Sequence, residues 1–162
     1  MCWVTDADIS AFFDMLPHDR LLKTVAERVV DGTVLALLKM FLEAPIIDES
    51  DGGRPQRNSK GTPQGGVISP LLANIYLNLM DRNFRRHVEA GKLHGRLVRY
   101  ADDFVVLTPR RPDREMAWVT ALMQRLGLTL SPVKTRMLNA REEDFDFLGH
   151  RIRWRYGRMY LD

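Results

Sequence analysis

Two adjacent aspartates interrupt an otherwise apolar stretch, RYADDFVVL. Tyr100 and the apolar residues that follow the pair have the character of a buried strand, and two neighbouring negative charges are costly to bury in one. The stretch therefore predicts two short strands, 96–100 and 104–108, that meet at a tight turn. Asp102 and Asp103 then lie at a hairpin apex, where their carboxylates reach solvent while the strands on either side are buried.

Hydrophobic spacing and turn chemistry predict the remaining elements. A strand-like segment opens the chain, and residues 45–60 favour a hairpin whose tip carries DESDGG. Ser69 and Pro70 are typical of a helix start. Helices are predicted over 19–30, 33–44, 69–91 and 114–127, and further strands over 130–138, 145–153 and 157–162. This order predicts an α+β fold, in which a ferredoxin-like split βαβ core packs helices on one face of an antiparallel sheet and a small hairpin ends the chain.

Composition narrows the class of protein. With 162 residues, 45% of them hydrophobic, the chain suffices for one domain with a substantial core, so we expect a single domain over 1–162. A net charge of +3 permits a nucleic-acid partner without establishing one. The single cysteine excludes an internal disulfide framework, and no apolar run reaches the roughly 18 residues of a membrane span. We expect a cytoplasmic protein with no membrane partner.

A third carboxylate would let the hairpin apex hold paired cations. Hard oxygen ligands suit Mg²⁺, and two-metal sites hold their ions about 3.5–4 Å apart. The segment TDADIS offers Asp6 and Asp8, which strand alternation places on one face. We choose Asp8 because it lies at the end of the first strand, which in a split βαβ sheet runs beside the central hairpin. Taken singly, DAD also fits solvated edge charges and DD a polar turn.

Five segments occur together and in a fixed order. They are DADISAFFDMLPHDRL, KGTPQGGVISPLLANIYLNLMD, RYADDFVVL, LSPVKTRML and FDFLGHRI. Jointly they resemble the successive sequence blocks of reverse transcriptases, most of all those of bacterial group II introns. The resemblance runs from about Val4 to Ile152 and implies the palm domain of an RNA-directed DNA polymerase, an enzyme of the retroelement family.

The resemblance assigns the chemistry to the three aspartates. It matches Asp8 to the catalytic aspartate of the first block and Asp102 with Asp103 to the YxDD pair. It implies that Asp8 and Asp102 chiefly bind two Mg²⁺ ions, with Mn²⁺ as a substitute, while Asp103 completes the acidic cluster. The implied reaction is attack of a primer 3′-hydroxyl on the α-phosphate of a dNTP, with release of pyrophosphate.

Four further residues are implied at the nucleotide. Phe13 matches the aromatic residue that excludes a ribose 2′-hydroxyl, although Phe13 and its neighbour Phe12 also suit ordinary core packing. Gln64 matches the glutamine that contacts the nucleotide, and Gly65 lets the backbone approach a ligand closely. Tyr100, the first residue of the YxDD motif, is expected at the substrate.

Two more segments complete the expected site. Lys134 resembles the family lysine near the leaving pyrophosphate, where it would donate a proton, and a surface lysine is the alternative. Leu148 and Gly149 lie in FLGHRI, which resembles the turn that grips the primer strand.

The resemblance also implies partners and parts. Expected partners are an RNA template, a DNA primer and dNTP, with intron RNA as an additional candidate. A complete member of the family has fingers before the Asp8 segment and a helical thumb after FLGHRI; we expect both to be absent, which predicts weak or no activity for this chain and makes self-association a candidate property. The alternative function is a non-catalytic RNA-binding module that assists splicing, as maturases do. Nucleotidyl cyclases lack the PQG loop, and RNA-dependent RNA polymerases usually carry GDD and a small polar group where Phe13 lies.

Overall fold

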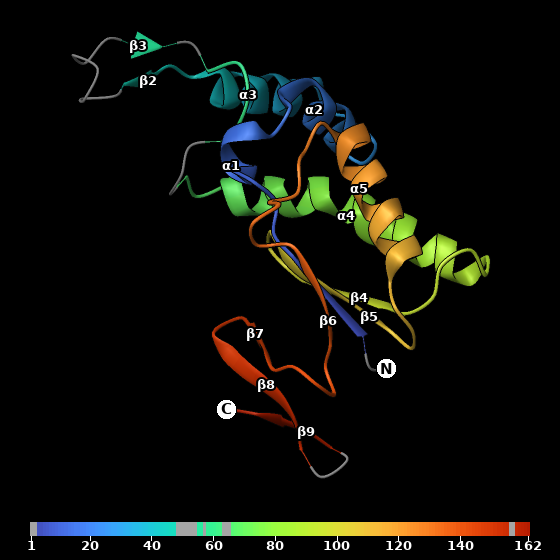
Figure 1. Cartoon of the computed structure of the whole chain (residues 1–162). Helices are drawn as coiled ribbons and strands as arrows, with labels where there is room; N and C mark the ends of the chain where they lie inside the picture. The colour runs from blue at the N-terminus through green and yellow to red at the C-terminus, as the bar shows by residue number, and fades with distance from the viewer. Residues whose placement is uncertain (1–2, 48–54, 57, 63–65, 156–157) are drawn as a thin grey trace. The chain divides into compact units, whose positions relative to one another are not determined.

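The computed structural model describes residues 3–47, 55–56, 58–62, 66–155 and 158–162 (Figure 1). The helices are α1 (Phe12–Met15), α2 (His18–Ala26), α3 (Gly32–Glu43), α4 (Ser69–Glu89) and α5 (Asp113–Leu126). The strands are β1 (Trp3–Ala7), β2 (Ile46–Ile47), β3 (Pro55–Gln56), β4 (Arg96–Tyr100), β5 (Asp103–Thr108), β6 (Arg136–Asn139), β7 (Phe145–Phe147), β8 (His150–Arg155) and β9 (Arg158–Leu161).

The chain divides into two compact units. We call the first the sheet unit; it comprises Met1–Ser10, Met80–Arg125 and Thr129–Asp162. We call the second the helical unit; it comprises Ala11–Leu79 and Leu126–Leu128. All three predicted catalytic aspartates belong to the sheet unit.

The sheet unit is built on a four-stranded antiparallel sheet in the order β4-β5-β1-β6. β1 runs beside β5, with Trp3 opposite Thr108 and Ala7 opposite Phe104. The prediction that the first strand lies beside the central hairpin is therefore confirmed. The hairpin itself turns over Ala101 and Asp102, because Tyr100 pairs with Asp103.

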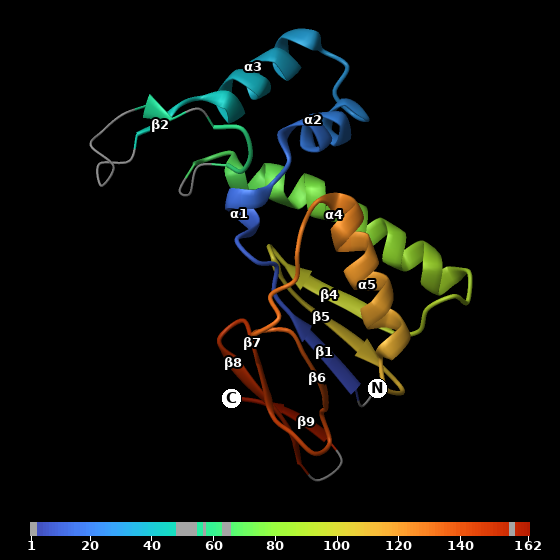
Figure 2. The same ribbon diagram turned by 45° about the horizontal axis from the view of Figure 1, so that its top comes forward.

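The two faces of this sheet are covered differently (Figure 2). On one side lie α5 and the second half of α4, which contact each other through an edge-to-face pair of Phe84 and Trp118 at 5.6 Å. On the other side lies a smaller sheet in the order β7-β8-β9. The predicted α+β arrangement, with helices on one face of an antiparallel sheet, is confirmed.

A buried cluster joins the two sheets. Its members come from β1, β5, β6, β7 and the residue after β6: Val4, Val105, Leu138, Ala140 and Phe145. Strand alternation places Val4 and Asp6 on the same face of β1. The face that carries the acidic residues is thus the one that packs against β7–β9.

The starts of α2 and α3 carry residues that commonly precede or cap a helix. Pro17 precedes α2, and the Asp31 carboxylate accepts hydrogen bonds from the backbone N–H groups of Thr33 and Val34 at the start of α3. The core of the helical unit includes Tyr76, whose hydroxyl donates to the carbonyl oxygen of Leu126 at 2.6 Å. β2 pairs with β3 as the predicted hairpin requires, and the tip of that hairpin lies outside the described residues.

Four local features differ from expectation. The short helix α1 was not anticipated within the first segment. The strand expected over 130–138 is confined to β6, since a turn occupies 132–134. The strand expected over 145–153 is a hairpin, β7 and β8. Tyr100, grouped by sequence with buried residues, is 67% exposed because it lies at the end of the edge strand β4.

None of the described helices combines the length and the apolar character that a membrane crossing requires.

Candidate active site

An open cleft of about 390 Å³ lies at the ends of β1 and β5 in the sheet unit. Its lining includes Asp6, Ala7, Asp8, Asp103, Val133, Lys134 and Arg136. Three of the four residues predicted to be catalytic, Asp8, Asp103 and Lys134, therefore share one cleft.

Strand pairing brings two of the carboxylates together. Ala7 pairs with Phe104, so the next residue on β1's path, Asp8, comes level with Asp103 of the neighbouring strand. Alternation gives Asp6 and Asp8 the same face, as predicted. Two segments almost one hundred residues apart thus deliver carboxylates to one place.

A short stretch of backbone pairing positions Lys134. Ser10 donates its N–H to the Thr129 carbonyl oxygen at 2.9 Å, and Ser131 donates to the Asp8 carbonyl oxygen at 2.8 Å. The turn that follows is held by Ser131, which accepts from the Thr135 N–H at 2.9 Å. The Lys134 ammonium ends 3.2 Å from Oδ2 of Asp8.

Burial and like charges act on the carboxylates of this cleft. The pKa of Asp103 is raised above its ordinary value, first by burial and then by the negative charges of Asp102 and Asp8, while Lys134 opposes the rise. Burial likewise raises the pKa of Asp6, against the hydrogen bond from Arg136. Among the lining residues named above, three are carboxylates and two are cations, so negative charge is in excess, as a cation-binding site requires.

Asp102 lies in the turn of the β4–β5 hairpin, at the predicted apex. The negative charge of Asp102 contributes to the raised pKa of Asp103, although Asp102 is not among the residues named above as lining the cleft. The preceding Ala101 has φ of 52°, in the left-handed region that two-residue hairpin turns require. Tyr100 pairs with Asp103, which places both on the face of the sheet that carries Asp8.

Phe13, one of the predicted nucleotide residues, lies in the helical unit. Phe12 is buried and Phe13 is half-buried, with their rings edge to face at 5.4 Å. The carbonyl oxygen of Phe13 accepts from the Thr62 N–H at 2.6 Å, and Gly61 donates to the Leu16 carbonyl oxygen at 2.7 Å. The start of the GTPQGG loop is thus bound to α1, beside Phe13.

Gly61 fits that position because it has no side chain. Its φ is +84°, and a Cβ built on it would lie 2.6 Å from the carbonyl oxygen of Phe13. The buried His18 adds a further restraint by donating from Nε2 to the Gly61 carbonyl oxygen at 2.6 Å. Gln64 and Gly65 lie outside the described residues.

Leu148 and Gly149 form the turn between β7 and β8. Both adopt positive φ, 53° and 78°, and the Leu148 side chain is 44% exposed. Phe145, three residues before Leu148, belongs to the buried cluster that joins the two sheets. The turn is therefore attached to the sheet unit through its own first strand.

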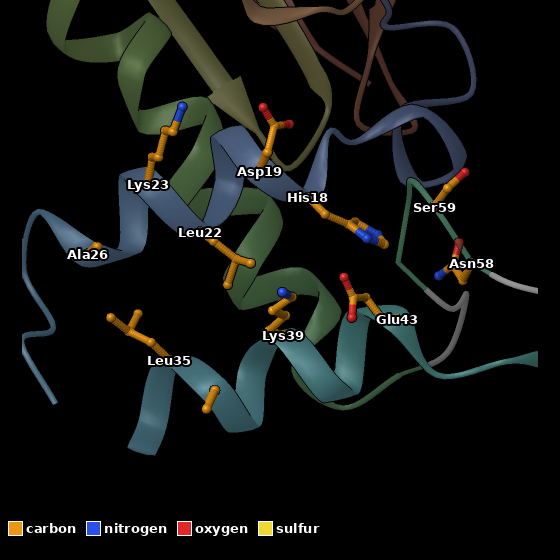
Figure 3. Close-up of a pocket in the computed structure, with 11 residues that line it drawn as sticks. His18, Asp19, Leu22, Lys23, Ala26, Leu35, Lys39, Glu43, Asn58 and Ser59 are labelled. Carbon is orange, nitrogen blue, oxygen red and sulfur yellow. The ribbon is translucent and has the colours of Figure 1, made fainter. Parts of the chain in front are cut away.

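A larger cavity of about 790 Å³ lies in the helical unit (Figure 3). It is lined by α2, α3 and the segment before Gly61, with Leu22 and Leu35 among its apolar residues and Lys23, Lys39 and Glu43 among its charged ones. None of the predicted site residues that the structure describes is among its lining residues. This cavity is larger than the cleft at the ends of β1 and β5, but none of the four predicted catalytic residues is among its lining residues, so we do not assign the reaction to it.

Sequence reasoning missed several charged partners of this region. Arg136 and Asp6 pair across neighbouring strands, at 3.3 Å between Nε and Oδ2. Arg99 of β4 contacts Asp81 of α4, with Nε 3.0 Å from Oδ1 and a terminal nitrogen 2.6 Å from Oδ2. The sequence offers no signal for these pairs, because each residue alone also fits a solvated surface.

The side chains do not converge as metal ligands in the structure as it stands. Over the described ranges, no three His, Cys, Asp or Glu side chains are gathered closely enough to hold an ion. The donor chemistry nonetheless fits a hard divalent cation, because the carboxylates come from adjacent backbone positions and repel one another.

Comparison with known sequences gives a consistent set of relatives. The family model described as reverse transcriptase (RNA-dependent DNA polymerase) matches residues 1–152. Protein YkfC of Escherichia coli is 33% identical over 97% of this chain and 49% of its own length. A 91 kDa protein in the cob intron of Schizosaccharomyces pombe is 28% identical over 93% of this chain and 25% of its own. The group II intron-encoded protein LtrA of Lactococcus lactis is 35% identical over 49% of this chain.

Solved structures show the same fold. Apo telomerase of Candida tropicalis matches 99% of this chain with a TM-score of 0.74 at 18% identity, over 35% of its own length. Telomerase of Candida albicans, solved with a fragment of telomeric RNA, matches with a TM-score of 0.75 at 15% identity. This chain spans about half or less of each of these proteins.

Proposed function

This chain belongs to the reverse transcriptase (RNA-dependent DNA polymerase) family, and we propose that its sheet unit carries out metal-dependent transfer of a deoxynucleotide to a primer 3′-hydroxyl on an RNA template. The single observation that carries the proposal is the cleft in which Asp8, Asp103 and Lys134 meet. The resemblance assigns the chemistry to three aspartates, and two of them, Asp8 and Asp103, are among the lining residues of this cleft.

Asp8 and Asp102 would hold two Mg²⁺ ions, or Mn²⁺ in their place, and Asp103 would complete the acidic cluster. Bound there, the ions would lower the pKa of the attacking hydroxyl and neutralise charge on the phosphates. Support comes from the raised pKa of Asp103, which is caused by burial and by neighbouring negative charges. A bound cation would stabilise the ionised carboxylate and offset the repulsion between the charges. The three residues lie at a turn and a strand end, where side-chain rotation alone changes their separation.

Lys134 would protonate the leaving pyrophosphate. Its ammonium already lies at the cleft, 3.2 Å from Oδ2 of Asp8, and the side chain is 69% exposed. A long, exposed side chain can turn from a carboxylate to a phosphate, since an exposed ion pair contributes little to stability.

The remaining residues would select and hold the substrates. Phe13 would exclude ribonucleotides by its bulk, and Gln64 and Gly65 would contact the nucleotide from the loop that Gly61 and Thr62 begin. Tyr100 would contact the substrate from the acidic face of the sheet. Leu148 and Gly149, in the β7–β8 turn, would contact the primer strand.

Primer extension tests the proposal directly. A DNA primer on an RNA template is incubated with this chain, Mg²⁺ or Mn²⁺, and either dNTP or rNTP. We expect weak extension with dNTP, in agreement with the low activity that the sequence predicts, and a strong preference for dNTP over rNTP. Asp102→Asn should lower this extension about 100-fold or more, because that change removes charge at the reacting phosphates.

Two results would contradict the proposal. Extension that survives Asp8→Asn and Asp102→Asn would remove the cleft from the chemistry. Absence of extension together with tight binding of structured intron RNA would favour the RNA-binding module instead, and a filter-binding assay on the same preparations decides this.

A further inference from the structure

A guanidinium group fastens the turn that carries the paired aspartates. Arg99 donates from Nε and a terminal nitrogen to both carboxylate oxygens of Asp81, at 3.0 Å and 2.6 Å. Its other terminal nitrogen donates to the carbonyl oxygen of Ala101 at 2.7 Å. One side chain therefore connects α4 to the peptide that joins Ala101 to Asp102.

Burial makes this connection stronger than an ordinary surface ion pair. The Arg99 side chain is 10% exposed and that of Asp81 is 26% exposed. Two parallel charge-assisted hydrogen bonds fix the plane of the guanidinium, which then presents its remaining nitrogen in one direction. The acceptor belongs to Ala101, whose positive φ is unfavourable for any residue other than glycine. A restraint on this carbonyl thus acts where the backbone most needs one.

The contact is made on the face of the sheet opposite the reactive cleft. Arg99 pairs with Phe104, and both point to the side of α4, whereas Tyr100 and Asp103 point to the side of Asp8. Arg99 therefore lies away from the acidic face, and any effect on the chemistry must pass through the backbone of the turn.

We propose that Arg99 is a positioning residue: held by Asp81, it fixes the peptide between Ala101 and Asp102 so that the Asp102 and Asp103 carboxylates are presented together at the cleft. The proposal rests on the proposed function in one respect, namely that these carboxylates bind divalent cations. The link from α4 through Arg99 to the turn does not depend on that function.

The test uses variants with a matched control. Arg99→Met removes the guanidinium, and Arg99→Lys keeps the charge but cannot bind Asp81 through two nitrogens and reach Ala101 as well. Arg96→Met, on the same strand but three residues away, is the control because it leaves all three contacts in place. Circular dichroism and thermal unfolding first establish which variants are folded. If Arg99→Met is not folded, the measurements below are made on Arg99→Lys alone.

Two measurements follow on the full chain. Without metal, hydrogen exchange of the backbone amides of Asp102 and Asp103 should become about tenfold or more faster in the Arg99 variants, with no change at the far end of β5. Calorimetric titration with Mn²⁺ should show affinity weakened about 10–100-fold in the same variants, as is usual when a residue that orients metal ligands is lost. Asp81→Asn alone should also weaken Mn²⁺ affinity, but the same change should add little further loss in a chain that already carries Arg99→Met.

The outcomes are separable. Unchanged exchange in a folded Arg99 variant overturns the proposal, and so does faster exchange with unchanged Mn²⁺ affinity, because the turn would then be held without consequence for the ligands. Equal losses in Arg96→Met also overturn it. If Mn²⁺ binding to the wild type is insensitive to Asp8→Asn and Asp102→Asn, the proposed function fails, and the exchange measurement still decides whether Arg99 holds the turn.

Discussion

Replacing Lys134 with methionine separates a structural role of this lysine from a chemical one. In the structure its ammonium contacts Asp8 at 3.2 Å, with 69% of the lysine side chain and 18% of the aspartate side chain exposed. An ion pair with one partner so exposed contributes at most about 1 kcal/mol to stability. A group that donates a proton to the leaving group contributes about 10²–10⁴-fold to the rate, which is roughly 3–5 kcal/mol of activation free energy.

Arg136→Met is the matched comparison. Arg136 also pairs with a carboxylate of the cleft, at 3.3 Å from Oδ2 of Asp6, and its side chain is 48% exposed. Both variants should lose at most about 1 kcal/mol in urea unfolding. In single-turnover addition of one dNTP, Lys134→Met should lose about 10²–10⁴-fold and also lose the basic limb of the pH profile, whereas Arg136→Met should keep that limb. Equal rate losses in the two variants, or an unchanged pH profile in Lys134→Met, would refute the chemical role.

Three other changes have definite expected outcomes. Phe145→Ala empties a position in the cluster between the two sheets and should lower the free energy of unfolding by about 3–5 kcal/mol; a change below about 1 kcal/mol in a urea titration would contradict the packing. Asp103→Asn should stabilise the metal-free protein at neutral pH, because the pKa of Asp103 is raised in the folded state and ionising this carboxyl therefore costs stability as the pH rises above 3.8. The difference in thermal stability between the variant and the wild type should disappear as the pH falls toward 3.8. A variant that is no more stable than the wild type at neutral pH would contradict the raised pKa. Phe13→Ala should raise rNTP use relative to dNTP by about 10–200-fold in primer extension, with dNTP addition itself retained; undiminished rejection of rNTP would remove Phe13 from sugar selection.

The elements predicted from the sequence are those whose physical signal is local. Adjacent carboxylates in an apolar run identified the β4–β5 turn, and Asp8 followed from the topology of a split βαβ sheet. The helix start at Ser69 was marked by its own residues, Ser69 and Pro70. The turn and the helix start need no knowledge of distant contacts, whereas the choice of Asp8 needed the expected order of the strands.

The features that were missed depend on pairing across the chain. β6 is short because Ser131 holds a turn within the segment expected to be a strand, and that turn brings Lys134 to Asp8. The link from Asp81 through Arg99 to Ala101 joins α4 to a hairpin turn, and Asp81 lies 18 residues before Arg99. Hydrophobic periodicity carries no signal for such polar contacts, because each residue alone fits a solvated surface.

Anomalous scattering from crystals of this chain grown with Mn²⁺ and a primer–template would locate the metal ions relative to the three aspartates. We expect two Mn²⁺ peaks about 3.5–4 Å apart, with carboxylate oxygens of Asp8 and Asp102 as ligands and Asp103 beside them. Mn²⁺ bound elsewhere, or Asp8 still paired with Lys134 while the metal lies away from the hairpin turn, would contradict it.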